Sequence, residues 1–221
     1  LAQPLGTQIP SEVIFSVPED LLAHGLQPAT HALAVRSCSS NPRVTIYPVH
    51  WVYLAAHCSN LPVQPPAASA TSPESTNSEK SEGRENITVP TFSLPLPYPE
   101  AFGPVFNYIY DKRPDLLLQK LLPRAEGLRV PASLYPGHYN PSNPQCASDF
   151  DAVTASLTRL PPQVLLASAL YLQGVYANVR ALGVVDDGIW ETIQIAHALL
   201  MKSIDVASRQ QQIVVTPQQL P

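Results

Sequence analysis

Proline is more than twice as frequent in this chain as in an average protein, with 25 prolines among 221 residues. Because proline lacks a backbone N–H and its ring clashes with the preceding helical turn, it interrupts helices and the interior of sheets. The composition therefore predicts few, sharply bounded helices and much irregular chain. An apolar fraction of 45% still supports a hydrophobic core, so residues 1–221 are expected to form a single domain.

The charge balance argues against several classes of partner. Charged residues make up 14% of the chain and the net charge is −4, with no basic run, so direct nucleic-acid binding is not expected. No apolar run approaches the length of a membrane span. The three cysteines, Cys38, Cys58 and Cys146, follow no disulfide or metal-binding pattern, which favours a reducing, intracellular compartment.

Two apolar blocks, residues 45–62 and 91–123, each read as a strand followed by a helix. They flank a Pro/Ser/Glu-rich stretch, residues 63–88, which cannot bury enough apolar surface to fold and is predicted to be a disordered insert. Runs of β-branched and apolar residues predict strands at Glu12–Val17, Arg43–Tyr47 and Ile87–Leu96. Thr30–Ser37 is compatible with a strand or a short helix, of which the strand is favoured. Apolar residues at helical spacing predict a buried helix over Val49–Ser59.

Helical periodicity dominates the rest of the chain. A helix starting at Pro99 carries an apolar stripe, and a second, Leu-rich helix spans Pro114–Leu122. Residues 124–162 are rich in Pro, Gly, Asn and Ser, so a long loop is expected, with one helical turn near Phe150–Leu157. The stripe of the Pro99 helix consists of Phe102, Val105, Phe106 and Ile109.

Residues 163–206 predict a C-terminal antiparallel helical hairpin. Gly183 suits the left-handed end of the first helix, and Asp186 or Asp187 suits the cap of the second. The buried side of the first helix is predicted to consist of Leu166, Leu170, Leu172, Val175, Val179 and Leu182. That of the second is predicted to consist of Ile189, Trp190, Ile193, Ala196, Leu200 and Ile204.

Candidates for chemistry are sparse. His50, His57 and Cys58 lie close together, but their spacing matches no CxxC or HxxxH metal motif, so no metal site is predicted. Cys58 as a nucleophile would need a histidine from elsewhere in the fold, because adjacent helical residues such as His57 point away from each other. A buried structural thiol is the simpler interpretation.

Two acid pairs and one leucine motif also have simpler structural interpretations. The pair Asp149 and Asp151 precedes a helical turn, and the pair Asp186–Asp187 has a capping role, so neither is assigned to acid–base catalysis. Leu118–Leu122 matches the LxxLL pattern of groove-binding helices, a string that core helices also show. No phosphate-binding loop is present, so neither catalytic residues nor a cofactor are predicted.

Part of the chain resembles BTB/POZ domains. The residues that carry this resemblance are His50, Leu54, Ala55, Ala56 and Cys58, together with 94–96, 99–102 and 108–110 in the second block. It implies a small mixed sheet covered by helices, in which Leu54, Ala55 and Ala56 permit close helix packing. The N-terminal helix that many BTB proteins exchange on dimerisation is not evident, so neither homodimerisation nor cullin recruitment is carried over.

The stretch LGVVDDGIW at 182–190 and the preceding YANV at 176–179 are similar to the clampless-type developmental regulators of basidiomycete fungi. This resemblance implies a regulator of sexual development that is needed for clamp connections and acts through protein partners in the nucleus. It implies no enzymatic activity.

Taken together, these features predict an α/β (α+β) fold and a non-enzymatic protein–protein interaction module, with transcription regulators among the candidate partners. Aromatic and aliphatic anchors dominate such interfaces, and the predicted contacts are Tyr98, Tyr110, Leu118, Leu122 and Trp190. Two alternatives stay open: a substrate adaptor of a ubiquitin ligase, and a Cys/His hydrolase. The hydrolase requires an exposed Cys58 in a pocket, whereas the interaction module requires a buried one.

Overall fold

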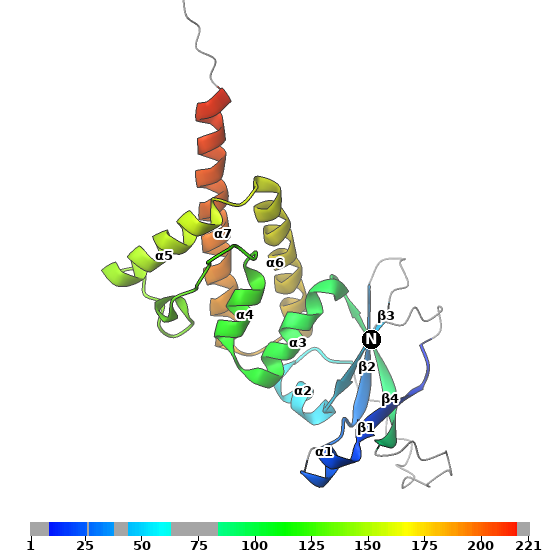
Figure 1. The fold of residues 1–221 in the computed structure, drawn as a ribbon. Coiled ribbons are helices and arrows are strands. Elements are labelled where there is room, and N and C mark those ends of the chain that lie inside the picture. Colours follow the sequence, from blue (N-terminus) through cyan, green and yellow to red (C-terminus); the bar gives the residue numbers. More distant parts are fainter. Residues whose placement is uncertain (1–8, 26, 38–43, 63–83, 216–221) are drawn as a thin grey trace, which may run out of the picture. The chain divides into compact units, whose positions relative to one another are not determined.

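The computed structural model describes residues 9–25, 27–37, 44–62 and 84–215. It divides the chain into two compact units. The sheet unit comprises residues 1–99 with 181–184, and the helical unit comprises residues 100–180 with 185–221. A mixed sheet together with helices confirms the predicted α/β (α+β) class (Figure 1).

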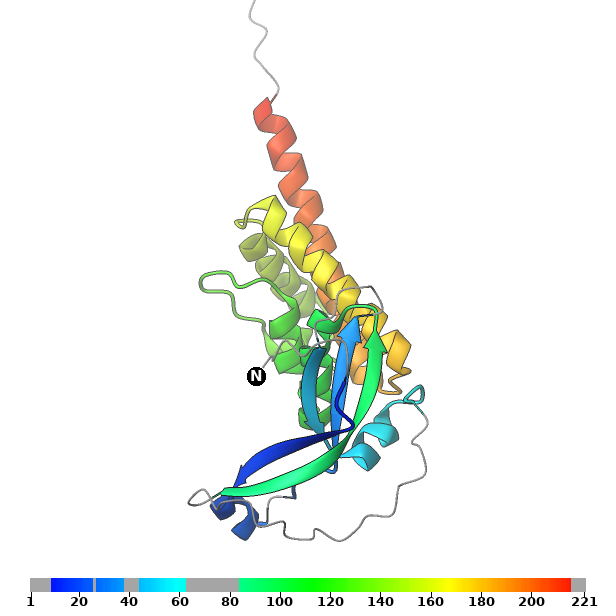
Figure 2. The ribbon, with the colours of Figure 1, turned by 90° about the vertical axis from the view of Figure 1, so that its right-hand side faces the viewer.

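The sheet unit is built around one long strand, β4 (Arg84–Leu96). The first half of β4 pairs antiparallel with β1 (Glu12–Pro18), and its second half runs parallel to β2 (His31–Ser37), as Figure 2 shows. Strand β3 (Val44–Val49) pairs antiparallel with β2, which gives the order β1-β4-β2-β3. The strands predicted at the N-terminus are thus confirmed. The most buried part of the sheet is in β2: Ala32, Leu33, Ala34 and Val35, all 0% exposed.

The predicted disordered insert, residues 63–88, overlaps the start of β4. Residues 63–83 lie outside the described residues. Arg84–Asn86 are strand, which corrects the prediction for these three positions, whereas Ile87 and Thr88 also belong to the predicted strand Ile87–Leu96. In the pairing with β1, Arg84 lies opposite Pro18 and Thr88 opposite Ile14. The strand partner gives this polar segment backbone hydrogen bonds that its own composition does not indicate.

Helix α1 (Glu19–Ala23) follows β1, and α2 (Trp51–His57) follows β3. Helix α2 is half buried, which corrects the prediction of a buried helix. Val52 is 82% exposed, and Ala55 and Ala56, to which the resemblance assigned close packing, are exposed as well. A helix of two turns presents one side to the sheet, and that side here carries Trp51, Leu54 and, just after the helix, Cys58.

The sheet unit also includes the short segment 181–184. Gly183, with φ of 63°, adopts the left-handed conformation predicted for a helix end. The backbone N–H of Ser59 donates to the carbonyl of Gly183 at 3.1 Å, and that of Asn60 donates to Leu182 at 3.0 Å. A Cβ atom on residue 183 would collide with the Ser59 Oγ, so the approach of the two segments requires glycine.

The helical unit shows where the prolines act. Prolines form the first turns of three helices, where the missing N–H costs no hydrogen bond. They therefore fix helix starts and do not make the helices short, since α6 has 21 residues and α7 has 29. After the 3₁₀ turn η1 (Pro99–Ala101), the helices are α3 (Phe102–Asp111), α4 (Pro114–Leu121), α5 (Pro144–Leu157), α6 (Pro162–Leu182) and α7 (Asp187–Val215), with the turn η2 (Ala132–Leu134) before α5.

Helix α5 corrects the prediction of a long loop over residues 124–162. It spans 14 residues rather than one turn near Phe150–Leu157. Asn143 caps its start, because the side-chain oxygen accepts a hydrogen bond from the Gln145 N–H at 2.9 Å. The polar composition of its first half reflects the exposed side of a helix, with Cys146, Val153 and Leu157 on the buried side.

The predicted buried face is largely correct for α7 and partly wrong for α6. In α7, Ile189, Ile193, Ala196 and Leu200 are buried as predicted, and this helix packs closely against α4 and α5 (Figure 1). In α6, the predicted core residues Leu166 and Leu170 are 51% and 66% exposed. Leu165 is buried instead, in line with Leu172, Val175, Val179 and Leu182.

Candidate protein-binding site

The residues predicted to contact a partner are scattered. Tyr98 belongs to the sheet unit and is 40% exposed. In the helical unit, Tyr110 is half-buried and its ring lies 4.9 Å from that of Phe106. Trp190 is also half-buried and packs edge-on against Tyr176, with ring centroids 5.7 Å apart.

The LxxLL string of α4 belongs to the core. Leu118 is 0% exposed and Leu122 is 4% exposed, and Leu121 between them is buried as well. In this structure these side chains pack within the helical unit and offer little surface to a partner. This is the behaviour expected of a core helix that happens to contain the motif.

Cys58 does not meet the requirement set for a hydrolase. Its side chain is 4% exposed within the sheet unit, whereas a nucleophile has to face a pocket. Among the described residues, no three His, Cys, Asp or Glu side chains come together as a metal site would require. None of the helices described is both long and apolar enough to cross a membrane.

The two acid pairs serve local structure. Asp149 accepts hydrogen bonds from Ser133 and Gln145, and Asp151 forms an ion pair with Lys202 at 2.7 Å. Asp186 caps α7 as predicted, since its Oδ1 accepts from the Gly188 N–H at 3.0 Å.

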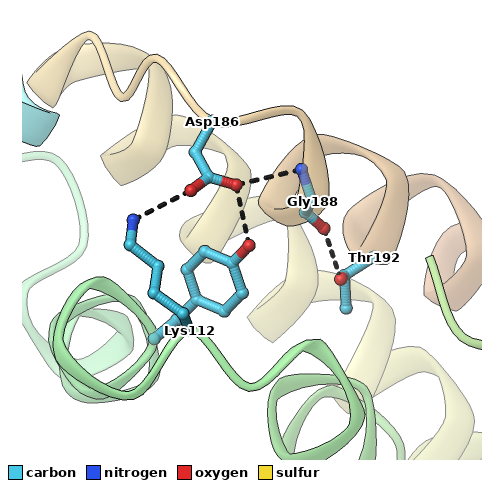
Figure 3. Close-up of polar contacts among 5 residues, drawn as sticks. Lys112, Asp186, Gly188 and Thr192 are labelled. Carbon is cyan, nitrogen blue, oxygen red and sulfur yellow. Dashed lines mark hydrogen bonds and ion pairs between the residues drawn. The ribbon is translucent and has the colours of Figure 1, made fainter. Parts of the chain in front are cut away.

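Asp186 is also the centre of a polar cluster between α3 and the start of α7, shown in Figure 3. We define the Asp186 cluster as Tyr108, Lys112, Asp186, Gly188 and Thr192. The Tyr108 hydroxyl donates to Asp186 Oδ1 at 2.7 Å, and Lys112 Nζ pairs with Oδ2 at 2.8 Å. The Thr192 hydroxyl donates to the Gly188 carbonyl at 2.6 Å. Both carboxylate oxygens of Asp186 are therefore engaged.

The cluster changes the acidity of its members. Burial and the hydrogen bond to Asp186 raise the pKa of Tyr108 far above its usual value. For Asp186, burial alone would raise the pKa of the carboxyl, but the hydrogen bonds from Lys112 and Tyr108 outweigh burial and lower it. The carboxylate is thus held in its charged form, as an ionic cap at the positive end of α7.

Gly188 allows this close approach of the two helices. A Cβ atom at this position would overlap the Tyr108 hydroxyl, and would lie 3.2 Å from Asp186 Oδ1. In the DDG sequence at 186–188, the first aspartate therefore caps α7, and the glycine leaves room for the Tyr108 hydroxyl. None of the cluster residues lines the two hollows described next, and Tyr108 lines a much smaller one together with Leu116 and Lys120.

A groove on the helical unit is a large, open concave surface within the described residues. It consists of two adjoining hollows of about 1110 Å³ and about 490 Å³, which share Lys120, Arg124 and Tyr171. We call it the cationic groove and define it by Leu116, Lys120, Arg124, Leu128, Arg129 and Tyr171. These residues come from α4, from the segment that follows it, and from α6.

The cationic groove combines apolar walls with charge that the chain does not neutralise. None of the residues lining either hollow is acidic. In the part of the chain that the structure describes, Lys120, Arg124 and Arg129 take part in none of the ion pairs. Such a surface lacks the convergent acid–base groups of an active site and suits binding.

Helix α6 also exposes apolar side chains, but only some of them line the hollows. Val164, which lines the smaller hollow, is 39% exposed, and Leu166 and Leu170 lie one turn apart on the outer side of the helix. Large apolar side chains that are exposed together on one helix mark interaction sites more often than isolated ones do. Sequence reasoning assigned both leucines to the core.

Two family models match the chain, and they follow the division seen in the structure. The chain is a two-part α+β protein, with a sheet unit at the N-terminus and a helical unit after it. The clampless protein 1 N-terminal domain matches residues 3–97, and the clampless protein 1 C-terminal domain matches residues 115–221. The chain belongs to the clampless protein family. None of the curated proteins matches it.

The structure identifies functional candidates that the sequence analysis did not. Lys120, Arg124 and Arg129 lie within or beside a segment interpreted as a plain loop, and they are separated along the chain from Tyr171. One signal was available in the sequence, namely three cations within ten positions of an otherwise acidic chain.

Proposed function

We propose that this protein is a non-enzymatic protein–protein interaction module in the programme that forms clamp connections, and that it binds its partners through the cationic groove. Membership of the clampless family supports the developmental role. The observation that carries the binding role is the groove itself, an open concave surface with exposed apolar and cationic side chains. Transcription regulators in the nucleus are the partners we propose, as an acidic chain can act beside DNA through another protein.

A BTB/POZ-like origin of the sheet unit is part of the proposal. The β2–β3 pair, the helix α2 that follows it, and the return of β4 parallel to β2 support it. The exposed side of α2 would then be a second contact surface, with Val52 and Tyr53 as its most exposed large residues.

The experiment replaces apolar groove residues in the full chain and follows clamp formation. The variant Leu116→Ser/Leu128→Ser removes apolar contact from the groove walls, and its matched control, Val185→Ser/Met201→Ser, removes it from exposed positions outside the groove. Partner capture by proximity labelling and the frequency of clamp connections are measured in a basidiomycete host.

We expect the groove variant to lose labelled partners and clamp connections while the control keeps both. Thermal unfolding of the purified proteins checks that both variants remain folded. Equal partner sets for the wild type and a folded groove variant would refute the groove as the binding face.

A further inference from the structure

From the charge and shape of the cationic groove, we infer that it receives an acidic amphipathic segment of another protein, with apolar side chains against the walls and carboxylates toward the cations. This inference rests on the proposed function and adds the chemistry of the partner.

Shape is the first argument for a peptide segment. The larger hollow, about 1110 Å³, is an open depression rather than the enclosed kind of pocket that buries most of a small ligand. It continues into a second hollow along α6, with Lys120 and Arg124 lining both. An elongated surface of this kind fits a helix or an extended strand of a partner better than a compact ligand.

Charge is the second argument. The chain has 17 acidic and 13 basic residues, yet three of the basic ones gather at this groove and no acidic residue lines it. Lys120, Arg124 and Arg129 are exposed and form no ion pair with any described residue. A partner carrying carboxylates would supply the complementary charge, which would fix the orientation of the complex and raise its association rate constant.

The apolar walls favour an acidic protein segment over a nucleic acid. Nucleic-acid sites track the phosphate backbone with a predominantly polar, basic surface, whereas here Leu116, Leu128 and Tyr171 lie between the cations. A segment with leucines along one face and glutamates along the other satisfies both the walls and the cations.

The test uses the full-length protein and a displayed library of amphipathic helical peptides, about 15 residues or four turns long, with their polar positions randomised. Selected peptides are then made with their acidic residues intact, changed to glutamine, or changed to lysine. Affinities are measured by fluorescence anisotropy, with a labelled DNA duplex as a further probe.

We expect the selected peptides to be net acidic, and we expect the glutamine versions to bind about tenfold more weakly, because several exposed ion pairs are lost. Salt should weaken the acidic peptide more than the glutamine version. The variant Arg124→Glu/Arg129→Glu should lose the acidic peptide and gain the lysine version. The matched control Arg159→Glu/Arg180→Glu, which alters exposed cations outside the groove, should bind as the wild type does.

The outcomes separate this inference from the proposed function. Peptides selected without charge preference, but lost in Leu116→Ser/Leu128→Ser, would overturn the acidic partner and keep the groove as a binding site. A library that yields no binder dependent on the groove would overturn both. Tighter binding of the DNA duplex than of any peptide, abolished by Arg124→Glu/Arg129→Glu, would replace the proposed partner by a nucleic acid.

Discussion

The Asp186 cluster and the cationic groove lie in the same helical unit and use charge in opposite ways. In the cluster, Asp186 accepts from Tyr108, Lys112 and the start of α7, so its charge is neutralised within the chain. In the groove, three cations line a hollow that contains no carboxylate. Removing one partner of an internally paired charge leaves the other uncompensated and destabilises the fold, whereas an exposed set without ion pairs leaves its interaction energy available to a partner.

The clearest sequence signature of the family, the stretch 182–190, lies in the Asp186 cluster and not in the cationic groove. Within the stretch 182–190, Asp186 caps α7 and forms an ion pair with Lys112, and Gly188 has no side chain that would collide with the Tyr108 hydroxyl. A distinctive motif can therefore identify a fold without identifying a binding site. Four predictions test whether the two regions differ as described.

The largest effect on stability is expected for Asp186→Ala. The Tyr108 hydroxyl, the Lys112 ammonium and the Gly188 N–H would lose their acceptor, so the free energy of unfolding should fall by about 2–3 kcal/mol. Urea denaturation measures it. Asp187→Ala, at the exposed neighbouring position, should cost less than about 1 kcal/mol. Equal losses would show that the cluster has no special role.

Gly188→Ala tests the fit between α7 and the tyrosine. Alanine normally stabilises a helix relative to glycine, but here its methyl group would overlap the Tyr108 hydroxyl, so we expect a loss of about 1–2 kcal/mol. In a Tyr108→Phe background, which lacks that hydroxyl, the penalty should shrink. Additive effects in this double-mutant cycle would contradict the close contact between position 188 and the Tyr108 hydroxyl.

The stabilisation by Asp186 should depend on pH. Because the folded state lowers the pKa of this carboxyl, its contribution is present above the unfolded pKa and is lost as the pH falls through the folded value. The stability difference between the wild type and Asp186→Asn, about 1 kcal/mol or more at neutral pH, should shrink below about pH 4. Denaturation curves across a pH series would detect it, and a difference that persists in acid would refute an ionic role.

The smallest effect on stability is expected in the groove. Arg124→Glu/Arg129→Glu should change the free energy of unfolding by no more than about 0.5 kcal/mol, because neither arginine pairs with an acid in the described structure. The same unfolding experiment measures it beside Asp186→Ala. A loss comparable to that of Asp186→Ala would show that the two arginines stabilise the fold, and the cationic groove would then not differ from the Asp186 cluster.

The sequence predicted those features that local pattern decides. The buried face of α7 followed from its spacing, and Asp186 was recognisable as a cap next to a helical stripe. Helix α6 could not be read in this way, because Val164, Leu165 and Leu166 are consecutive apolar residues and only tertiary packing determines which one is buried. In the structure, Leu165 is the buried one.

The rest depended on residues far apart in the chain. Lys112 and Asp186 are 74 positions apart, and no local signal joins them. Likewise, the groove forms only when the segment after α4 lies beside α6. Arg124 and Arg129 lie in a predicted loop and Lys120 lies in a predicted helix, so no local signal joins the three cations to α6. For α2, the helix was predictable, but its exposed side depends on how much of a short helix the sheet can cover.

The four residues 181–184, which complete the sheet unit, have a consequence for how this protein can be made and divided. During synthesis, Ser59 and Asn60 leave the ribosome long before the Leu182 and Gly183 carbonyls to which their N–H groups donate. The N-terminal part cannot assume its full set of backbone pairings until most of the polypeptide has been translated. A fragment cut at residue 99 would leave those donors to solvent, so expression of the halves calls for a circularly permuted or co-expressed design.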